Sequence, residues 1–472
     1  MSRRLSEATA NPAAGEARTS IIVTALLLAS LGVAIAQTIV VTALPVFGRQ
    51  LGVPAGSAAW LLTAFMLSSG IATPIAGRVG DLFGHRTVMI AGLVALTIGS
   101  VVAGVSDLAG SYPGLLIARV LQGLSGGVFP VAFGLARRSV PPGRLPGVVA
   151  ALSAMFGVGG ALGMVVAGPI TGALGTSWLF WTTAVIATAA LFCTAFLPGH
   201  EPHQGARLDL LGALLLSGTL VCLLLAISQG SAWGWGSAAV WTLFAAAVVL
   251  AALFVAAERR AAAPLIDLRL VYAPQLLPAH LATLVIGIGM FAAITLIPQF
   301  TQAPTSTGYG FGDSPSQTGL LMVPVALFMV VAAPLGTRIA RLTSSRTVFQ
   351  IGAVLAGVAL AGLAFVHGER WAFYVGGAML GLAYGLAFAS LGALVVGVVE
   401  HHQTGAATGL NTILRTIGGA VGAQLAAAVI TGSAPAGGLP TEAGHTAAFL
   451  TAACVAAAAA IAAAGISLKR AG

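Results

Sequence analysis

Apolar residues run along this chain in long segments, separated by short polar stretches that carry Arg, Pro, Gly or acidic residues. A helix needs roughly 20 apolar residues to cross about 30 Å of hydrocarbon. The pattern therefore predicts a series of membrane-spanning helices that continues almost to the C-terminus. We expect spans near residues 21–46, 57–77, 87–106, 112–135, 147–172, 178–197, 209–228, 237–257, 276–300, 317–336, 347–366, 372–396, 405–432 and 447–467.

Composition supports a lipid environment. The 472 residues are 58% hydrophobic and 7% charged, with a mean hydropathy of +1.00. A chain of this length could not bury so much apolar surface in a water-soluble core. The net charge of +9 does not indicate nucleic-acid binding, because the basic residues are scattered at segment ends and form no patch. Cys193, Cys222 and Cys454 lie in apolar segments, so we expect neither a disulfide framework nor a metal site.

The basic residues also predict the orientation of the spans. Of the 21 Lys and Arg residues, Arg49 and Arg370 fall on one side of the predicted spans, Arg119 and Arg415 fall within spans, and the others fall on the opposite side. Cytoplasmic loops are the ones enriched in Lys and Arg. We therefore expect a multi-pass protein of the inner or plasma membrane with both termini in the cytoplasm. Residues 1–20 lack a signal-peptide cleavage pattern and are expected to form a disordered cytoplasmic tail.

The two halves of the chain repeat. Gly159–Gly163 recurs as Gly418–Gly422 at an offset of 259, and Arg86-Thr87-Val88 recurs as Arg346-Thr347-Val348 at an offset of 260. Coincidence in a chain rich in Ala and Gly is the alternative. Collinear matches over an even number of spans predict two six-span bundles in parallel repeat. The expected organisation is a tail (1–20), an N-terminal bundle (21–197), an inserted helix pair with its flanking segments (198–275), a C-terminal bundle (276–467) and a second cytoplasmic tail (468–472).

The loop after the second span carries a specific pattern. Gly77, Asp81, Gly84 and Arg86 follow the spacing G-x-x-x-D-x-x-G-x-R, which resembles the loop signature of the major facilitator superfamily. Glycines permit a tight turn, and an acid beside a base can bind the positive N-terminus of a helix from the other half. The resemblance implies a conformational latch. An ordinary charged loop is the alternative.

Two further spans extend the resemblance. Arg119 precedes Gln122-Gly123 in the fourth span, similar to the superfamily's second motif, and a charge at bilayer depth tends to face a polar interior. The alternative is an arginine that reaches the membrane surface. The fifth span is similar to the antiporter motif, although its last glycine is replaced by Ala173, and the same small residues also occur in static helix packing. Its residues are Gly159, Gly163, Gly168, Pro169 and Gly172.

Three stretches narrow the resemblance to the fourteen-span drug:proton antiporters, a multidrug and antibiotic efflux family. They are Arg207–Gly212, Pro298–Phe300 with Gly319–Pro324, and Gly405–Asn411 through Arg415. The resemblance covers the chain after Ser20. It implies an all-α polytopic membrane protein with the major facilitator fold, built from two six-helix bundles and two inserted helices. Capping of a backbone carbonyl is the alternative role for Arg415.

One departure from that family bears on the substrate. The first span of relatives runs through an acid, and here that position is Gln37. No carboxylate is expected deep in a span, whereas a cation in a low-dielectric cavity requires a fixed anion. This favours neutral or anionic substrates. Proton coupling then follows from resemblance alone, with Asp81, Asp209, Glu400 and His280 as candidate titrating groups.

These observations predict a secondary exporter of lipophilic small molecules that works by alternating access and is coupled to protons. A facilitator or importer of a small organic anion and a transport-inactive receptor are the alternatives. We find no nucleophile-base constellation and no phosphate-binding loop, so we expect no enzyme, cofactor or metal, and we expect a monomer whose partners are substrate, protons and lipid. The candidate substrate-binding residues are Gln37, Thr38, Arg119, Gln122, Asn411, Arg415, Trp60, Phe129, Phe291 and Tyr384.

Overall fold

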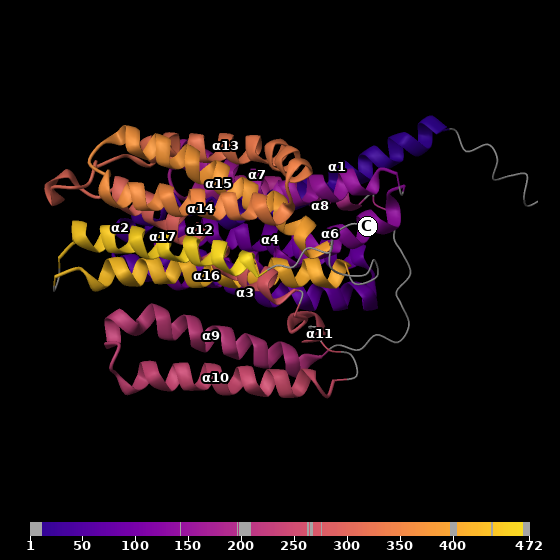
Figure 1. Ribbon diagram of the computed structural model, residues 1–472, viewed down its shortest axis with the longest axis horizontal. Coiled ribbons are helices and arrows are strands. Elements are labelled where there is room, and N and C mark those ends of the chain that lie inside the picture. The colour runs from indigo at the N-terminus through magenta and orange to yellow at the C-terminus, as the bar shows by residue number, and fades with distance from the viewer. Residues whose placement is uncertain are drawn as a thin grey trace, which may run out of the picture.

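A computed structural model describes residues 12–465 apart from 142, 196, 198–208, 262–263, 265–267, 275, 397–403 and 436–437. Within this part of the chain, 14 helices are long and apolar enough to cross a membrane, as the sequence predicts. They run side by side along the long axis of the molecule (Figure 1).

The N-terminal bundle contains six spans, two of which are interrupted. The first is followed by a short helix α2, and the fourth consists of α5 and α6 joined by a turn of 3₁₀ helix over Leu124–Gly127. The bounds are α1 Pro12–Thr38, α2 Leu44–Leu51, α3 Ala55–Phe83, α4 His85–Leu108, α5 Tyr112–Gly123, α6 Val128–Ser139, α7 Leu145–Leu174 and α8 Ser177–Ala195.

The C-terminal bundle repeats this arrangement with six continuous helices. Corresponding helices pack in the same pairs, since α1 packs against α7 as α12 packs against α16, and α4 packs against α8 as α14 packs against α17. The bounds are α12 Leu277–Thr301, α13 Pro315–Leu342, α14 Ser345–Phe365, α15 Arg370–Val396, α16 Thr404–Gly432 and α17 Glu442–Ala464.

Glycine pairs account for the closest of these packings. A side chain at Gly159 or Gly163 of α7 would meet the carbonyl oxygens of Leu31 and Ile35 in α1 at 3.1 and 3.0 Å. Their counterparts Gly418 and Gly422 of α16 face the carbonyl oxygens of Leu284 and Ile288 in α12 in the same way. Small residues four apart let two helix backbones approach in both halves.

The inserted helices α9 (Leu210–Trp233) and α10 (Ala238–Glu258) form a hairpin beside the two bundles (Figure 1). Helix α9 packs against α3 and α16, where Leu216 and Leu220 contact the side chains around Leu410. Helix α10 is the more peripheral, because 17% of its apolar segment is buried, compared with 78% for α12. The short helix α11 covers Leu268–Val271.

The two bundles meet along two seams, α3 against α16 and α7 against α13. Helices α3 and α13 begin at the same end of the molecule at which α7 and α16 terminate. We call this end the Ala55 end, after the first residue of α3. Polar contacts between the bundles gather toward this end, because Gln424 Nε2 donates to Thr63 Oγ1 at 2.7 Å and Ser316 Oγ donates to the carbonyl oxygen of Gly168 at 3.2 Å.

Two sequence expectations about the first span need correction. The expected tail includes residues 12–20, but these residues belong to α1, which begins at Pro12. The expected span 21–46 is not one helix, because α1 ends at Thr38 and turns occupy residues 39–43. Residues 38–42 are all β-branched and Pro45 follows closely, and both features disfavour the continuation of a helix.

Candidate functional site

The break between α1 and α2 creates backbone groups that need hydrogen-bond partners away from water. Unpaired backbone groups at membrane depth cost several kcal/mol, so such breaks occur where the protein supplies partners. Two long side chains do so here. Arg119 Nη1 donates to the carbonyl oxygen of Ala36 at 3.0 Å, and Gln302 Nε2 donates to the carbonyl oxygen of Thr42 at 2.7 Å.

Arg119 is fully buried and its side chain joins three helices. Besides Ala36, its Nε donates to the carbonyl oxygen of Leu61 in α3 at 2.6 Å, and its Nη1 donates to Gln122 Oε1 at 2.6 Å. Gln122 Nε2 in turn donates to Ser100 Oγ at 2.8 Å. Arg119 therefore does not extend to the membrane surface, and in this conformation most of its donors are engaged by the protein itself.

The polar side chains at the end of α1 are directed to α7. Thr38 Oγ1 donates to the carbonyl oxygen of Gly160 at 2.8 Å, and Thr42 Oγ1 donates to that of Met164 at 3.0 Å. Gln37 is 4% exposed and lies one residue from the carbonyl group that Arg119 caps. Arg119 and Gln122 are thus linked to the end of α1, where Gln37 and Thr38 are buried inside the N-terminal bundle.

Arg415 stands in a different environment, between the two bundles. Its guanidinium carbon lies 3.5 Å from the ring centre of Phe156 in α7 and 5.1 Å from that of Phe388 in α15. Phe129 of α6 is 5.2 Å from Phe156, measured between ring centres, and completes the aromatic group. Within the described part of the chain, Arg415 Nε is buried and lacks a hydrogen-bond acceptor. This arginine caps no carbonyl group there.

The two membrane-depth arginines therefore differ in their contacts. Both lie on aromatic rings, since the guanidinium carbon of Arg119 is 4.6 Å from the ring centre of Phe65. Arg119 donates through Nε and Nη1 and leaves only its buried Nη2 without a partner, whereas the buried Nε of Arg415 has no acceptor among the described residues. A guanidinium group has five N–H donors and no acceptor, so it binds carboxylate, sulfonate or phosphate oxygens well. Arg415 with Phe129, Phe156 and Phe388 is the candidate substrate site.

The remaining predicted contacts are distributed along the C-terminal bundle and the α3–α16 seam. Asn411 Nδ2 donates to Thr283 Oγ1 at 2.6 Å within the C-terminal bundle. Phe291 is buried against Gly419 of α16, and Trp60 is half-buried in α3. Tyr384 is 2% exposed and lines a pocket inside the C-terminal bundle. The ten predicted residues thus do not surround a single space in this conformation.

Sequence reasoning missed the polar contacts that join the bundles. Gln302 and Gln424 each donate to the opposite bundle, and Phe156 and Phe388 cover Arg415. The signal for the glutamines was present, since Gln424 stands in an otherwise apolar stretch of α16. Gln302 was hidden because it falls in what the hydropathy pattern assigns to a loop.

The structure describes the side chains of only some residues of the loop motif after the second span. Gly84 adopts a φ of 89°, a left-handed conformation that L side chains rarely adopt, and it forms the turn between α3 and α4. Arg86 donates to the carbonyl oxygen of Ala195 at the end of α8, in its own bundle. Gly77 faces open space. The side chain of Asp81 lies outside the described part, so its role as a latch stays a prediction.

The antiporter-like motif of α7 has two packing faces. Gly159 and Gly163 face α1, whereas Gly168 and Gly172 face α13 of the other bundle. A side chain at Gly168 would collide with the carbonyl oxygen of Pro315 and would lie 2.9 Å from the Cα atom of Gly319. Pro169 lies within α7 beside this contact, and Gly319 approaches its Cδ atom. The motif therefore brings the two bundles together at the Ala55 end.

Of the candidate titrating groups, the side chains of Asp209 and His280 are described, and both stand at the start of a helix. Asp209 is the N-cap of α9, where its Oδ1 accepts a hydrogen bond from the backbone N–H of Gly212 at 2.7 Å. His280 is buried in the first turn of α12. Glu400 lies outside the described residues. Among described acids, Asp107, Glu258 and Glu442 stand at helix ends, in agreement with the expectation that carboxylates avoid the middle of the spans.

Two helical bundles in parallel repeat with a polar, aromatic site between them are typical of polytopic membrane transporters. The chain matches the Major Facilitator Superfamily over residues 26–423 and 279–471 and belongs to that superfamily. It is 30% identical over 461 residues to an uncharacterized MFS-type transporter of Mycobacterium tuberculosis, aligning 92% of this chain and 64% of the relative. The chain thus spans just under two thirds of the length of that relative.

Other relatives have names that refer to drug and antibiotic resistance. The chain is 30% identical over 429 residues to the puromycin resistance protein of Streptomyces alboniger, covering 87% of this chain and 82% of the relative. It is 26% identical over 395 residues to the tetracenomycin C resistance and export protein of Streptomyces glaucescens, and the alignment covers 83% of this chain and 72% of that protein. The predicted superfamily and efflux-type relationship are confirmed.

A solved structure has the same fold. The human organic anion transporter MFSD10 superposes with a TM-score of 0.64 at 18% sequence identity, covering 95% of this chain and 99% of that one. The predicted all-α major facilitator fold is confirmed, and the family and the fold are those of transporters and not of enzymes.

Proposed function

We propose that this protein exports lipophilic anionic or neutral small molecules by alternating access, in exchange for protons. The observation that carries the anionic preference is Arg415, which stands between the bundles with its face on Phe156 and without an acceptor for Nε among the described residues. An oxyanion of the substrate supplies that acceptor. Resistance and export proteins among the relatives support export as the direction.

Charge balance gives the proposal a measurable form. Export of a monoanion in exchange for one entering proton moves two charges across the membrane. One charge is worth about 2.3 kcal/mol per 100 mV, so this exchange is driven by about 4.6 kcal/mol at that potential. A neutral substrate moves one charge. A facilitator of organic anions, the second candidate, would respond to the anion gradient and not to an imposed pH gradient.

The experiment uses purified full-length protein in proteoliposomes with an imposed pH gradient. The probes are decanesulfonate as a permanent anion, an uncharged lipophile, and a quaternary ammonium dye. We expect gradient-driven transport of the first two and little transport of the dye, and strongly weakened decanesulfonate transport in Arg415→Gln. Strong transport of the dye, or sulfonate transport that is unchanged in Arg415→Gln, contradicts the proposal.

Orientation is part of the same proposal. We infer that both termini face the cytoplasm, which places the Ala55 end outside, because the basic residues are concentrated on the opposite side of the spans. A cysteine introduced at Arg138 or Arg341 should resist an impermeant maleimide added to whole cells, whereas one at Arg370 should react. Labelling in the reverse order would invert the assignment.

A further inference from the structure

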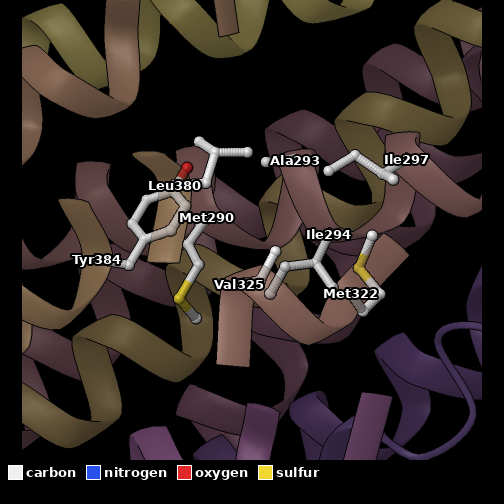
Figure 2. A pocket seen from close by; sticks show the side chains of 8 residues that line it. All are labelled: Met290, Ala293, Ile294, Ile297, Met322, Val325, Leu380 and Tyr384. Carbon is white, nitrogen blue, oxygen red and sulfur yellow. The ribbon is translucent and has the colours of Figure 1, made fainter. Parts of the chain in front are cut away.

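A pocket inside the C-terminal bundle lies next to the arginine site. Figure 2 shows side chains from three helices around it, and those used below are Met290 and Ala293 of α12, Met322 and Val325 of α13, and Leu380 and Tyr384 of α15. The lining is apolar apart from the hydroxyl group of Tyr384, which is buried without a hydrogen-bond partner among the described residues. The pocket is therefore suited to an apolar and not to a charged group, and its cavity of about 20 Å³ admits a longer hydrocarbon tail only when the side chains of Met290 and Met322 move aside.

The pocket and the arginine site share one helix. Tyr384 and Phe388 are four residues apart in α15, and residues at this spacing lie on the same face about one turn, or roughly 6 Å, from each other. Phe388 contacts Arg415, and Tyr384 lines the pocket. Moving along α15 from Phe388 toward its start at Arg370 therefore leads from the cationic group into the apolar pocket.

We propose that the site is bipartite, with Arg415 binding the anionic head of an amphiphile and the pocket binding its apolar tail. This inference rests on the proposed function and adds the class of substrate. The substrate is a monoanion with a hydrocarbon tail, and the tail begins within about one helical turn of the charged group. The tail enters the C-terminal bundle and points toward the Ala55 end, instead of lying between the bundles. The two methionine side chains are flexible and adapt the pocket to tails of different shape.

Chain length tests this placement. Each methylene group removed from water contributes roughly a fourfold gain in affinity, so binding should strengthen by about that factor per carbon until the pocket is full. The probes are n-alkanesulfonates of increasing length, and the readout is ligand-induced thermal stabilisation of the full-length protein in one fixed detergent. Partition of the longer probes into detergent is the same for all variants and cancels in the comparison between them.

Two variants of α13 provide the matched comparison. Val325 lines the pocket and is 5% exposed, whereas Val323 on the same helix is 38% exposed. We expect Val325→Phe to fill the pocket and flatten the dependence on chain length, with the affinity for butanesulfonate retained. Val323→Phe should keep the wild-type slope. A variant that enlarges the pocket, Met322→Ala, should extend the favourable slope to longer chains, a gain that misfolding cannot imitate.

The outcomes separate this inference from the proposed function. Equal slopes in Val325→Phe and Val323→Phe, or no extension of the slope in Met322→Ala, overturn the tail site even where Arg415→Gln abolishes anion transport. If the slopes change as expected but wild-type protein moves no sulfonate in proteoliposomes, the tail site stands and the proposed transport function fails.

Discussion

The guanidinium group of Arg415 lies 3.5 Å from the ring centre of Phe156, and the two residues occupy corresponding positions in the two halves of the chain, 259 residues apart. The pseudo-symmetry of the repeat thus brings equivalent positions of α7 and α16 face to face between the bundles. One of these positions is an arginine and the other is an aromatic residue. The positive charge of Arg415 is therefore held against the face of the Phe156 ring, and the repeat supplies no negative charge opposite it.

The first prediction separates the charge of Arg415 from its shape. Arg415→Gln should weaken decanesulfonate transport by about 10- to 100-fold, because a hydrogen bond to a charged group is worth about 1.5–3 kcal/mol. Arg415→Lys keeps the charge but loses the planar, stacking guanidinium group, so it should give an intermediate value. KM in proteoliposomes is the measurement.

Arg341→Gln is the matched control for that series, because Arg341 is an exposed residue in the last turn of α13. It should leave the KM for decanesulfonate unchanged. If Arg415→Lys and Arg415→Gln are equally impaired and the control is normal, stacking and not charge governs the site.

The second prediction assigns Arg119 a structural role at the helix break. Arg119→Met leaves the carbonyl oxygen of Ala36 and the amide of Gln122 without their partner, and an unsatisfied buried group costs about 1–3 kcal/mol. The Tm should therefore fall. The double variant Arg119→Met with Gln122→Leu should regain part of the loss, because it removes one of the abandoned partners. An unchanged Tm together with abolished transport would instead place Arg119 in direct contact with substrate.

Sequence patterns predicted the fold almost completely and the site in part. Span length, positive charge and repeated glycines depend on local composition, and the helices follow them closely. The break after Thr38 was missed because the apolar, β-branched residues that form the turn have the same hydropathy as residues of a membrane helix. In the structure, Arg119 and Gln302 supply the hydrogen bonds that the backbone carbonyl groups at this break require. The partners of Arg415 could not be predicted, because stacking on Phe156 and Phe388 depends on how three helices cross.

The third prediction concerns pH and the Asp313–Arg370 ion pair at the Ala55 end. Arg370 Nη2 lies 2.6 Å from Asp313 Oδ1, and the Asp313 side chain is fully buried while that of Arg370 is 49% exposed. Burial raises the pKa of Asp313 above its usual value of 3.8, and Arg370 offsets this only in part. The folded protein therefore binds this proton more tightly than the unfolded chain, and the stability that Asp313 contributes increases as the pH falls through the raised pKa toward 3.8 and is lost as the pH rises through the raised pKa.

Asp313→Asn tests this sign. The variant should be at least as stable as wild type at pH 7, and its advantage should shrink as the pH is lowered toward 4.5. Arg370→Gln removes the positive charge that partly stabilises the ionised Asp313 carboxylate. The Tm of this variant should therefore be lower than that of wild type at pH 7 and should rise more steeply than that of wild type as the pH is lowered. A loss of Tm in Asp313→Asn that grows with pH would mean that the ion pair outweighs the cost of burial. Thermal melts of the three proteins between pH 4.5 and 7.5 provide the comparison.

The fourth prediction uses two glycines of α7 that differ in what they face. A methyl group at Gly168 would collide with the carbonyl oxygen of Pro315 across the seam, whereas one at Gly160 would lie 3.6 Å from Thr38 Cγ2, an ordinary contact. Overpacking costs about 1–3 kcal/mol, and the bundles can relieve it by separating at the Ala55 end. Gly168→Ala should therefore shift the population away from this conformation by about 5- to 150-fold and slow transport. Gly160→Ala should transport normally.

Accessibility at the same end measures the shift independently of transport. Thr431 of α16 is half-buried, and its Cγ2 atom lies 4.0 Å from the position of a side chain at Gly56 of α3. In a background without native cysteines, Thr431→Cys should react faster with an impermeant maleimide when Gly168→Ala is present than when Gly160→Ala is present. Equal rates in the two backgrounds, with transport lost only in Gly168→Ala, would show that Gly168 does not hold the bundles together at this end and that its importance for transport has another cause.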